Sequence, residues 1–176
     1  VELEAIEKDD THSHRKGLER YRLTDRGRIM ARMPIDPRLS RMLIEAQQHG
    51  CLSQMLVIAA VLSIQDPRER PVEKEQAADQ AHTVFKDPAS DFVTLLNIWE
   101  RSKGILRMGL LKHFCREHFL SFRRIREWRD IHRQLKAIAS EAGLSQAGGA
   151  AARTAPVAAA ASRTDTFGAL YTAIHI

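Results

Sequence analysis

The stretch LTDRGRIMARMPIDPRLSRMLIEAQQHGCLSQMLVIAAVLS, residues 23–63, decides the fold of this 176-residue chain. Its Thr24 offers a side-chain oxygen to the free amides of a helix start, and the short helix it opens is closed by Pro34. Asp36 and Pro37 then begin a second helix, because Asp caps helix starts and the first turn does not need the N–H that Pro lacks. The cap is the favoured role for Asp36, in preference to that of a catalytic acid.

The second helix has one apolar face, and the helix after it is apolar all round. Apolar residues recur in the second helix at the spacing i, i+3, i+4, i+7: Leu39, Met42, Leu43 and Ala46. Gly50 supplies the left-handed stop, and Ser53 is a candidate cap for the next helix. Residues 54–63 read QMLVIAAVLS, which leaves almost no polar face. We therefore expect them to form the central, most buried helix.

Residues 1–23 contain a short apolar run, LEAI, a polar stretch with a turn signal, and a segment, LERYRL, in which apolar and polar side chains alternate. This pattern predicts a short β-hairpin with Gly17 near its turn. Towards the C-terminus, apolar periodicity predicts helices at 77–85, 92–104, 106–118 and 121–139. Ser121 is a candidate cap of the last helix. Trp128 and Phe122 lie near its apolar stripe, which favours a core role for both over base stacking. The fold class expected from the residues is mainly α with a short hairpin near the N-terminus.

The composition changes at residue 142. Residues 142–166 contain ten Ala, three Gly and only three charged residues, which predicts a flexible linker. Residues 167–176, FGALYTAIHI, look like the start of an amphipathic helix. Because the chain does not begin with Met, we expect it to be a piece of a longer protein.

Several kinds of chemistry have no motif in this sequence. There is no phosphate-binding GxxxxGK[ST] loop, no GxGxxG and no GxSxG. No run of 18 apolar residues predicts a membrane span, so no membrane partner is expected. The two cysteines, Cys51 and Cys115, are far apart, and no His or Cys spacing suits a metal, so we expect no metal and no cofactor in this chain. Cys115 on an amphipathic helix is interpreted as a small buried hydrophobe. With no visible signal peptide, the cysteine usage favours a reducing, cytoplasmic location.

Positive charge is concentrated in two segments. Residues 101–136 carry eleven Lys and Arg against three Asp and Glu, and residues 15–41 carry nine against three, whereas the whole chain has a net charge of only +5. Two basic segments on an otherwise acidic chain are typical of a protein that binds a polyanion. Solvated helix faces would give the same charge runs, and only clustering on one face separates the two interpretations.

Three stretches resemble, in order, the helicase-associated region of DEAH-box RNA helicases. The first is residues 23–63, with Leu23, Thr24, Gly27, Met30, Ala31, Pro34, Asp36, Pro37, the run Ser40-Arg41-Met42-Leu43, Gly50 and Cys51 at the matching positions. The second is FKDPASDFVTLLNIWE, and the third is FCREHFLSFRRIREWRDIHRQL, residues 114–135. The third stretch is most similar to the bacterial HrpA-type members.

The resemblance implies a degenerate winged helix followed by a helical, ratchet-like bundle. In these terms residues 1–50 are a partial winged-helix region, 51–141 the ratchet-like domain, 142–166 the linker and 167–176 the truncated start of an oligonucleotide-binding (OB) fold. It also implies an accessory part of an ATP-dependent RNA helicase that contributes single-stranded RNA binding and translocation-channel surface. The ATP, the Mg²⁺ and the hydrolase activity would belong to the RecA-like motor domains of the parent chain.

The residues expected to contact RNA are Arg116, His118, Ser121, Arg123 and Arg126. Each also has a structural interpretation: Arg123 could pair with Glu127, and His118 could be a core histidine among aromatic rings. Arg123, Arg126 and Arg133 are expected to share a face of the last helix, from which Arg124 and Lys136 diverge, and this modestly favours RNA binding. The alternative function is a helical protein-interaction or regulatory module that docks motor domains or partners without touching RNA. A free-standing winged-helix DNA binder is disfavoured, because no long recognition helix precedes Pro34.

Overall fold

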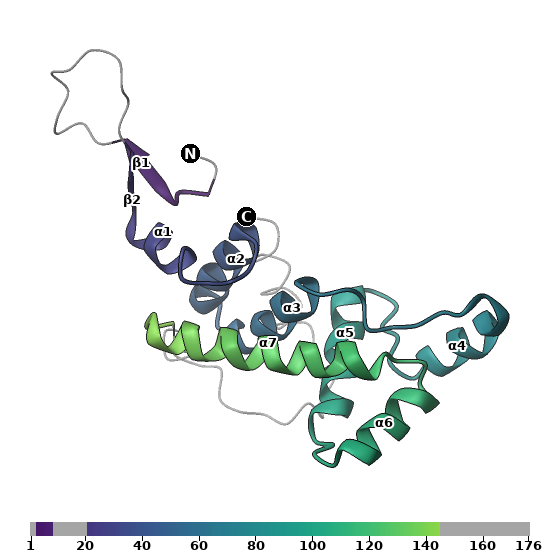
Figure 1. Ribbon diagram of the computed structural model, residues 1–176. Helices are drawn as coiled ribbons and strands as arrows, with labels where there is room; N and C mark the ends of the chain where they lie inside the picture. The colour runs from purple at the N-terminus through teal and green to yellow at the C-terminus, as the bar shows by residue number, and fades with distance from the viewer. Residues whose placement is uncertain (1–2, 9–20, 145–176) are drawn as a thin grey trace, which may run out of the picture.

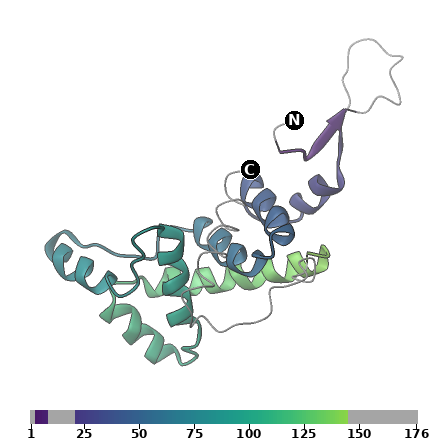
Figure 2. The same cartoon turned by 180° about the vertical axis from the view of Figure 1, so that it is seen from behind.

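The computed structural model describes residues 3–8 and 21–144, which are mainly helical (Figure 1). In chain order the elements are β1 (Ile6–Lys8), β2 (Tyr21–Leu23), α1 (Asp25–Met30), α2 (Pro37–Gln48), α3 (Leu52–Leu62), the 3₁₀ turn η2 (Val72–Lys74), α4 (Glu75–His82), α5 (Asp91–Lys103), α6 (Met108–Glu117) and α7 (Phe122–Glu141). Seen from both sides, the hairpin projects from one end of the molecule and α4 from the other (Figures 1 and 2). The prediction of a mainly α fold with a short N-terminal hairpin is confirmed.

The hairpin is antiparallel, with Ile6 opposite Leu23, and it joins α1 through close backbone contact. The Thr24 amide donates to the Ala5 carbonyl at 3.0 Å. Gly27 lies directly against the same carbonyl, and a Cβ at this position would overlap its oxygen. A glycine in α1 therefore lets the strand segment pack onto the helix.

The predicted helix ends are largely confirmed. Thr24 Oγ1 accepts from the Gly27 amide at 3.0 Å, and Asp36 Oδ1 accepts from the Arg38 amide at 2.7 Å. Gly50 ends α2 with φ +67°. The prediction of Ser53 as a cap is wrong, because α3 already begins at Leu52 and Ser53 lies inside its first turn.

Helix α3 is the centre of the core and packs against α2, α5 and α7. Eight of its residues are buried: Leu52, Met55, Leu56, Val57, Ile58, Ala59, Ala60 and Val61. Trp128 of α7 is fully buried beside them, and its indole Nε1 donates to the Val57 carbonyl at 2.9 Å. Its ring centroid lies 5.2 Å from that of Trp99. The predictions of a central buried helix and of a core role for Trp128 are confirmed.

The helical body extends past residue 141. Gly143 has φ +77°, and the Leu144 amide donates to the Ala139 carbonyl at 2.8 Å, so the chain folds back at the end of α7. Leu144 is buried in the same core, because this turn directs its side chain inward. The predicted linker start at 142 is thus wrong for residues 142–144. The rest of that linker and residues 167–176 lie outside the described residues.

One buried cluster includes side chains from both sides of residue 50. The predicted division at 50 between a winged-helix region and a ratchet-like domain therefore coincides with no gap in the core, and it stays a prediction.

Candidate nucleic-acid interface

Helices α6 and α7 are joined by a turn, residues 118–121, and the five predicted contact residues lie in this turn or within five residues of it along the chain. Arg116 lies in the last turn of α6 and His118 at its C-cap position. Ser121 occupies the N-cap position of α7, as predicted, although its hydroxyl makes no capping hydrogen bond. Arg123 and Arg126 follow within the first turn and a half of α7. Residues from two helices thus surround one turn.

The three arginines are exposed and have no carboxylate partner within the described part of the chain. Arg116 lies 3.1 Å from His113 Nδ1, and the Arg126 guanidinium lies 5.8 Å from the centre of the Phe122 ring. Arg123 forms neither a hydrogen bond nor an ion pair with another described residue, so the alternative pair with Glu127 is not formed.

Seven arginines elsewhere on the molecule contrast with these three, whereas Arg32, Arg38, Arg101 and Arg107 are also exposed and also have no carboxylate partner among the described residues. Those that pair with a carboxylate are Arg22, Arg26, Arg28, Arg41, Arg68, Arg70 and Arg133. Opposite charges at these distances offset much of the field that each guanidinium would otherwise present to a polyanion. None of the three guanidiniums around the α6–α7 turn is offset by an ion pair with a described residue.

His118 and Ser121 are tied into the turn itself. The imidazole Nδ1 of His118 donates to the Phe114 carbonyl at 2.9 Å. The centre of the His118 ring lies 4.4 Å from the centre of the Phe114 ring and 5.2 Å from that of the Phe85 ring. The Ser121 amide donates to the Pro67 carbonyl at 2.8 Å. These contacts give both residues a structural role, whether or not a ligand touches them.

Two other arginines of the basic segment 101–136, Arg124 and Arg129, donate hydrogen bonds to oxygen atoms of distant segments. Arg124 donates to the Asp66 carbonyl at 2.9 Å and to Gln65 Oε1 at 2.5 Å. Arg129 donates to the Ser102 carbonyl and, at 3.1 Å, to the Ile105 carbonyl, at the C-terminal end of α5. Burial lowers the pKa of Arg129. Helical spacing could not show these contacts, because their partners lie far away in the sequence.

The described residues offer little to other chemistries. Cys51 and Cys115 are both buried and free. Burial raises the pKa of the Cys51 thiol and raises that of Cys115 to about 11. No group of three or more His, Cys, Asp or Glu in the described ranges is arranged to hold a metal ion. Among the helices of the described residues, none has the length and hydrophobicity needed to cross a bilayer.

Comparison with known proteins identifies the arrangement. Residues 36–95 match the helicase associated domain (HA2), ratchet-like. The chain carries a ratchet-like helicase-associated domain. The match covers α2, α3, α4 and the start of α5, and the interface at the α6–α7 turn follows it in the chain.

Three curated relatives of the helicase-associated domain are ATP-dependent RNA helicases by name. The chain is 43% identical over 147 residues to ATP-dependent RNA helicase HrpA of Escherichia coli (strain K12), covering 81% of this chain and 11% of that protein. It is 42% identical over 146 residues to the HrpA homolog of Haemophilus influenzae, with the same coverage. It is 39% identical over 113 residues to the pre-mRNA-splicing factor ATP-dependent RNA helicase prp22 of Schizosaccharomyces pombe, covering 64% of this chain and 9% of that protein.

The resemblance to the helicase-associated region of HrpA-type DEAH-box RNA helicases is therefore confirmed. The chain spans about a tenth of the length of these relatives.

Proposed function

We propose that this helicase-associated domain supplies a single-stranded RNA-binding surface to an ATP-dependent RNA helicase and forms part of its translocation channel. The observation that carries the proposal is the set of three exposed arginines without carboxylate partners around one turn, Arg116, Arg123 and Arg126. The similarity to proteins named as ATP-dependent RNA helicases supports it. ATP and Mg²⁺ would be bound by RecA-like motor domains of the parent chain, which are the second proposed partner.

Arginine suits both parts of a single-stranded RNA. Its guanidinium forms paired hydrogen bonds with phosphate oxygens, and its flat face stacks on unpaired bases. A basic track that follows the backbone, with planar groups beside it, is the common arrangement of proteins that bind single strands with little sequence preference. His118 and Ser121 would add polar contacts to the backbone or to base edges.

Binding of a fluorescent single-stranded RNA to the 176-residue chain at several salt concentrations tests the proposal. Each phosphate contact on a single strand contributes about −0.7 to the slope of log affinity against log salt. Replacing Arg116, Arg123 and Arg126 together with Gln should weaken binding and flatten this slope by about 2.

A matched control removes the same charge elsewhere: Arg22, Arg28 and Arg70, all exposed and all paired with carboxylates, are replaced with Gln. This control should leave the slope nearly unchanged. Equal effects of the two triple variants would mean that only net charge matters, and the site would be rejected.

A second observation favours the alternative of a protein-docking module. Leu106, just before α6, and Met108 and Leu110, in its first turn, expose 86%, 48% and 56% of their surface. Clustered aliphatic side chains on a surface mark protein contacts more often than RNA contacts. If the arginine variant keeps full RNA affinity, docking of a motor domain or partner protein becomes the better function.

We also propose that the chain alone does not hydrolyse ATP, because its sequence contains no GxxxxGK[ST] loop. Purified chain should release no phosphate from ATP, with or without RNA, above a heat-denatured sample. RNA-stimulated phosphate release that survives further purification would contradict this.

A further inference from the structure

The turn between α6 and α7 contains a residue in an unfavourable backbone conformation. Phe119 has φ +48°, in the left-handed region that residues with a bulky side chain rarely adopt. Such a conformation persists only where the surrounding structure holds it in place. The contacts of this turn therefore decide how α6 and α7, which carry the proposed RNA contacts, are placed relative to each other.

Residues 65–69, called here the strap, make those contacts. The Phe119 carbonyl accepts from the Glu69 amide at 2.8 Å, and the Ser121 amide donates to the Pro67 carbonyl at 2.8 Å. Arg68 and Leu120 form an isolated antiparallel bridge between these two bonds. His82 of α4 donates from Nε2 to the same Phe119 carbonyl at 3.1 Å.

The strap also holds the first turn of α7, through Arg124 and its bonds to Asp66 and Gln65. It thus contacts Phe119 and the residues that follow it, as far as Arg124.

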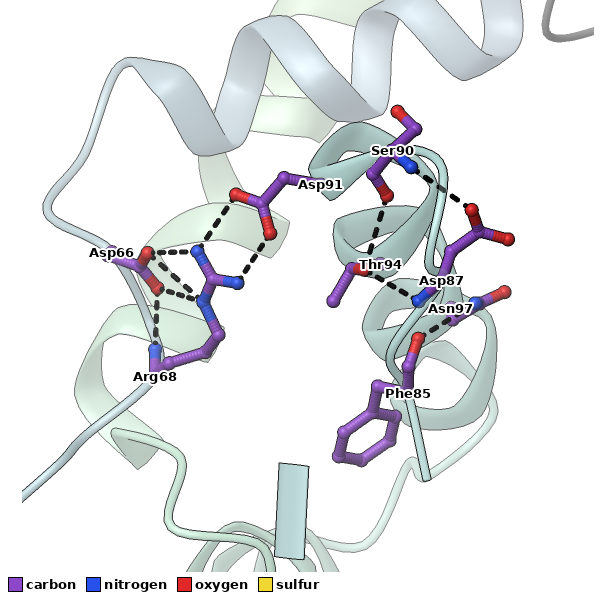
Figure 3. A network of polar contacts seen from close by, with 8 residues as sticks. All are labelled: Asp66, Arg68, Phe85, Asp87, Ser90, Asp91, Thr94 and Asn97. Atoms are coloured by element: carbon purple, nitrogen blue, oxygen red, sulfur yellow. Dashed lines mark hydrogen bonds and ion pairs between the residues drawn. The ribbon is translucent and has the colours of Figure 1, made fainter. Parts of the chain in front are cut away.

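The strap is fixed in turn by the side chain of Arg68. Figure 3 shows its guanidinium between two carboxylates, those of Asp66 and Asp91. The guanidinium bonds Asp91 twice, at 2.7 and 3.1 Å, and bonds Asp66 with its Nε and one terminal nitrogen. Paired bonds of this kind between planar groups fix direction as well as distance.

The paired bonds between Arg68 and Asp91 are called here the clamp. Asp91 is the first residue of α5, and several hydrogen bonds fix the backbone around it. Asp87 Oδ1 accepts from the amides of Ala89 and Ser90, at 2.9 and 3.1 Å, just before α5 begins (Figure 3). Thr94 Oγ1 accepts from the Asp87 amide at 2.9 Å, and Asn97 donates to the Phe85 carbonyl at 2.9 Å. These bonds leave Asp91 little freedom to follow a moving strap.

We propose that Arg68 is a positioning residue of the RNA surface: by clamping the strap to α5 it holds the α6–α7 turn, and so sets how α6, with Arg116, lies relative to α7, with Arg123 and Arg126. This inference rests on the proposed RNA function. Arg68 itself is a poor candidate for RNA contact, because its side chain is only 26% exposed and two carboxylates offset its charge.

A charge-neutral double variant tests the clamp. Arg68→Gln with Asp91→Asn removes the paired bonds and leaves the net charge unchanged. The matched control is Arg70→Gln with Asp79→Asn, which removes another doubly bonded Arg–Asp pair, at 2.8 and 2.9 Å, that does not touch the turn. We expect the clamp variant to bind single-stranded RNA about fivefold more weakly at a temperature where both proteins are folded, and the control to bind as the wild type does.

Equal RNA affinities of the two variants would overturn the proposal. If the double variant does not fold, the RNA affinity of the single variant Asp91→Asn tests the proposal instead. This substitution removes one negative charge, which by simple electrostatics strengthens RNA binding, so weaker binding supports the clamp and equal or stronger binding overturns it.

Hydrogen exchange separates this proposal from the proposed function. The amides of Glu69 and Ser121 both donate across the strap and should exchange faster in the clamp variant than in the control. Unchanged exchange at both amides would overturn the clamp even if the chain binds RNA. Faster exchange, with no RNA binding by the wild type, would instead remove the proposed function and leave the clamp as a structural device.

Discussion

Replacing Gly27 with Ala tests how the hairpin joins the helical body, because two effects of opposite sign compete there. In an exposed helix the change would stabilise the protein by about 0.5–1 kcal/mol, since Ala loses less backbone entropy than Gly. In this structure the added Cβ would overlap the Ala5 carbonyl oxygen, which is a backbone atom that cannot rotate away. The strand segment must then move off α1.

The magnitude follows from the bonds that this movement breaks. The Thr24 amide would lose the Ala5 carbonyl, at 3.0 Å, and Thr24 Oγ1 would lose the Glu4 carbonyl, at 2.7 Å. Each such bond contributes about 1 kcal/mol net. Together they outweigh the gain in helix propensity, so we expect Gly27→Ala to lower the free energy of unfolding by about 1 kcal/mol.

Urea denaturation followed by circular dichroism measures this change, with Gly109→Ala as the matched control. Gly109 lies in α6 with no atom of another residue near its Cβ position, so the same substitution there should stabilise the chain by a few tenths of a kcal/mol. If only the strand segment detaches, faster exchange of the Thr24 amide will report it. Equal or greater stability of Gly27→Ala, with unchanged exchange at Thr24, would refute the reasoning.

Three further predictions concern the core. Ile58→Asp places an unpaired charge at a position with no exposed surface and should cost about 4 kcal/mol, so stability close to that of the wild type in urea would contradict the central place of α3. Trp128→Phe keeps a ring but removes the bond to the Val57 carbonyl, and should cost about 2 kcal/mol in the same assay. Burial, with Lys136 and Lys103 nearby, lowers the pKa of His132, so the unfolded chain takes up this proton first as the pH falls through about 6.5. Stability should therefore decrease between pH 7.5 and 5.5, and His132→Gln should make that decrease smaller; an identical pH profile in the variant would exclude the effect.

Local signals in the sequence predicted the helix boundaries well. Thr24, Asp36 and Gly50 act within a few residues of their own positions, so their chemistry alone indicates where a helix starts or stops. The burial of residues 55–61 was equally predictable, because a helix with almost no polar face has to be surrounded, although Leu62 at its end is exposed.

Contacts between distant segments were not predictable in this way. The clamp joins Arg68 to Asp91, and the strap meets the α6–α7 turn some 50 residues further along the chain. In the sequence Arg124 is one more cation of a basic helix, and only the fold shows that its guanidinium donates to Asp66 and Gln65 of the strap. Leu144 lies in a stretch whose composition indicates a linker, although a single Gly143 turn is enough to return it to the core.

The burial of both cysteines has a practical consequence for labelling the molecule. The chain contains no others, and each thiol is enclosed and has a raised pKa, so little thiolate forms at neutral pH. A cysteine introduced at an exposed site of α7, such as position 130, should therefore take up a maleimide dye much faster than either native thiol. One fluorophore could thus be attached beside the proposed RNA surface while the native core stays intact.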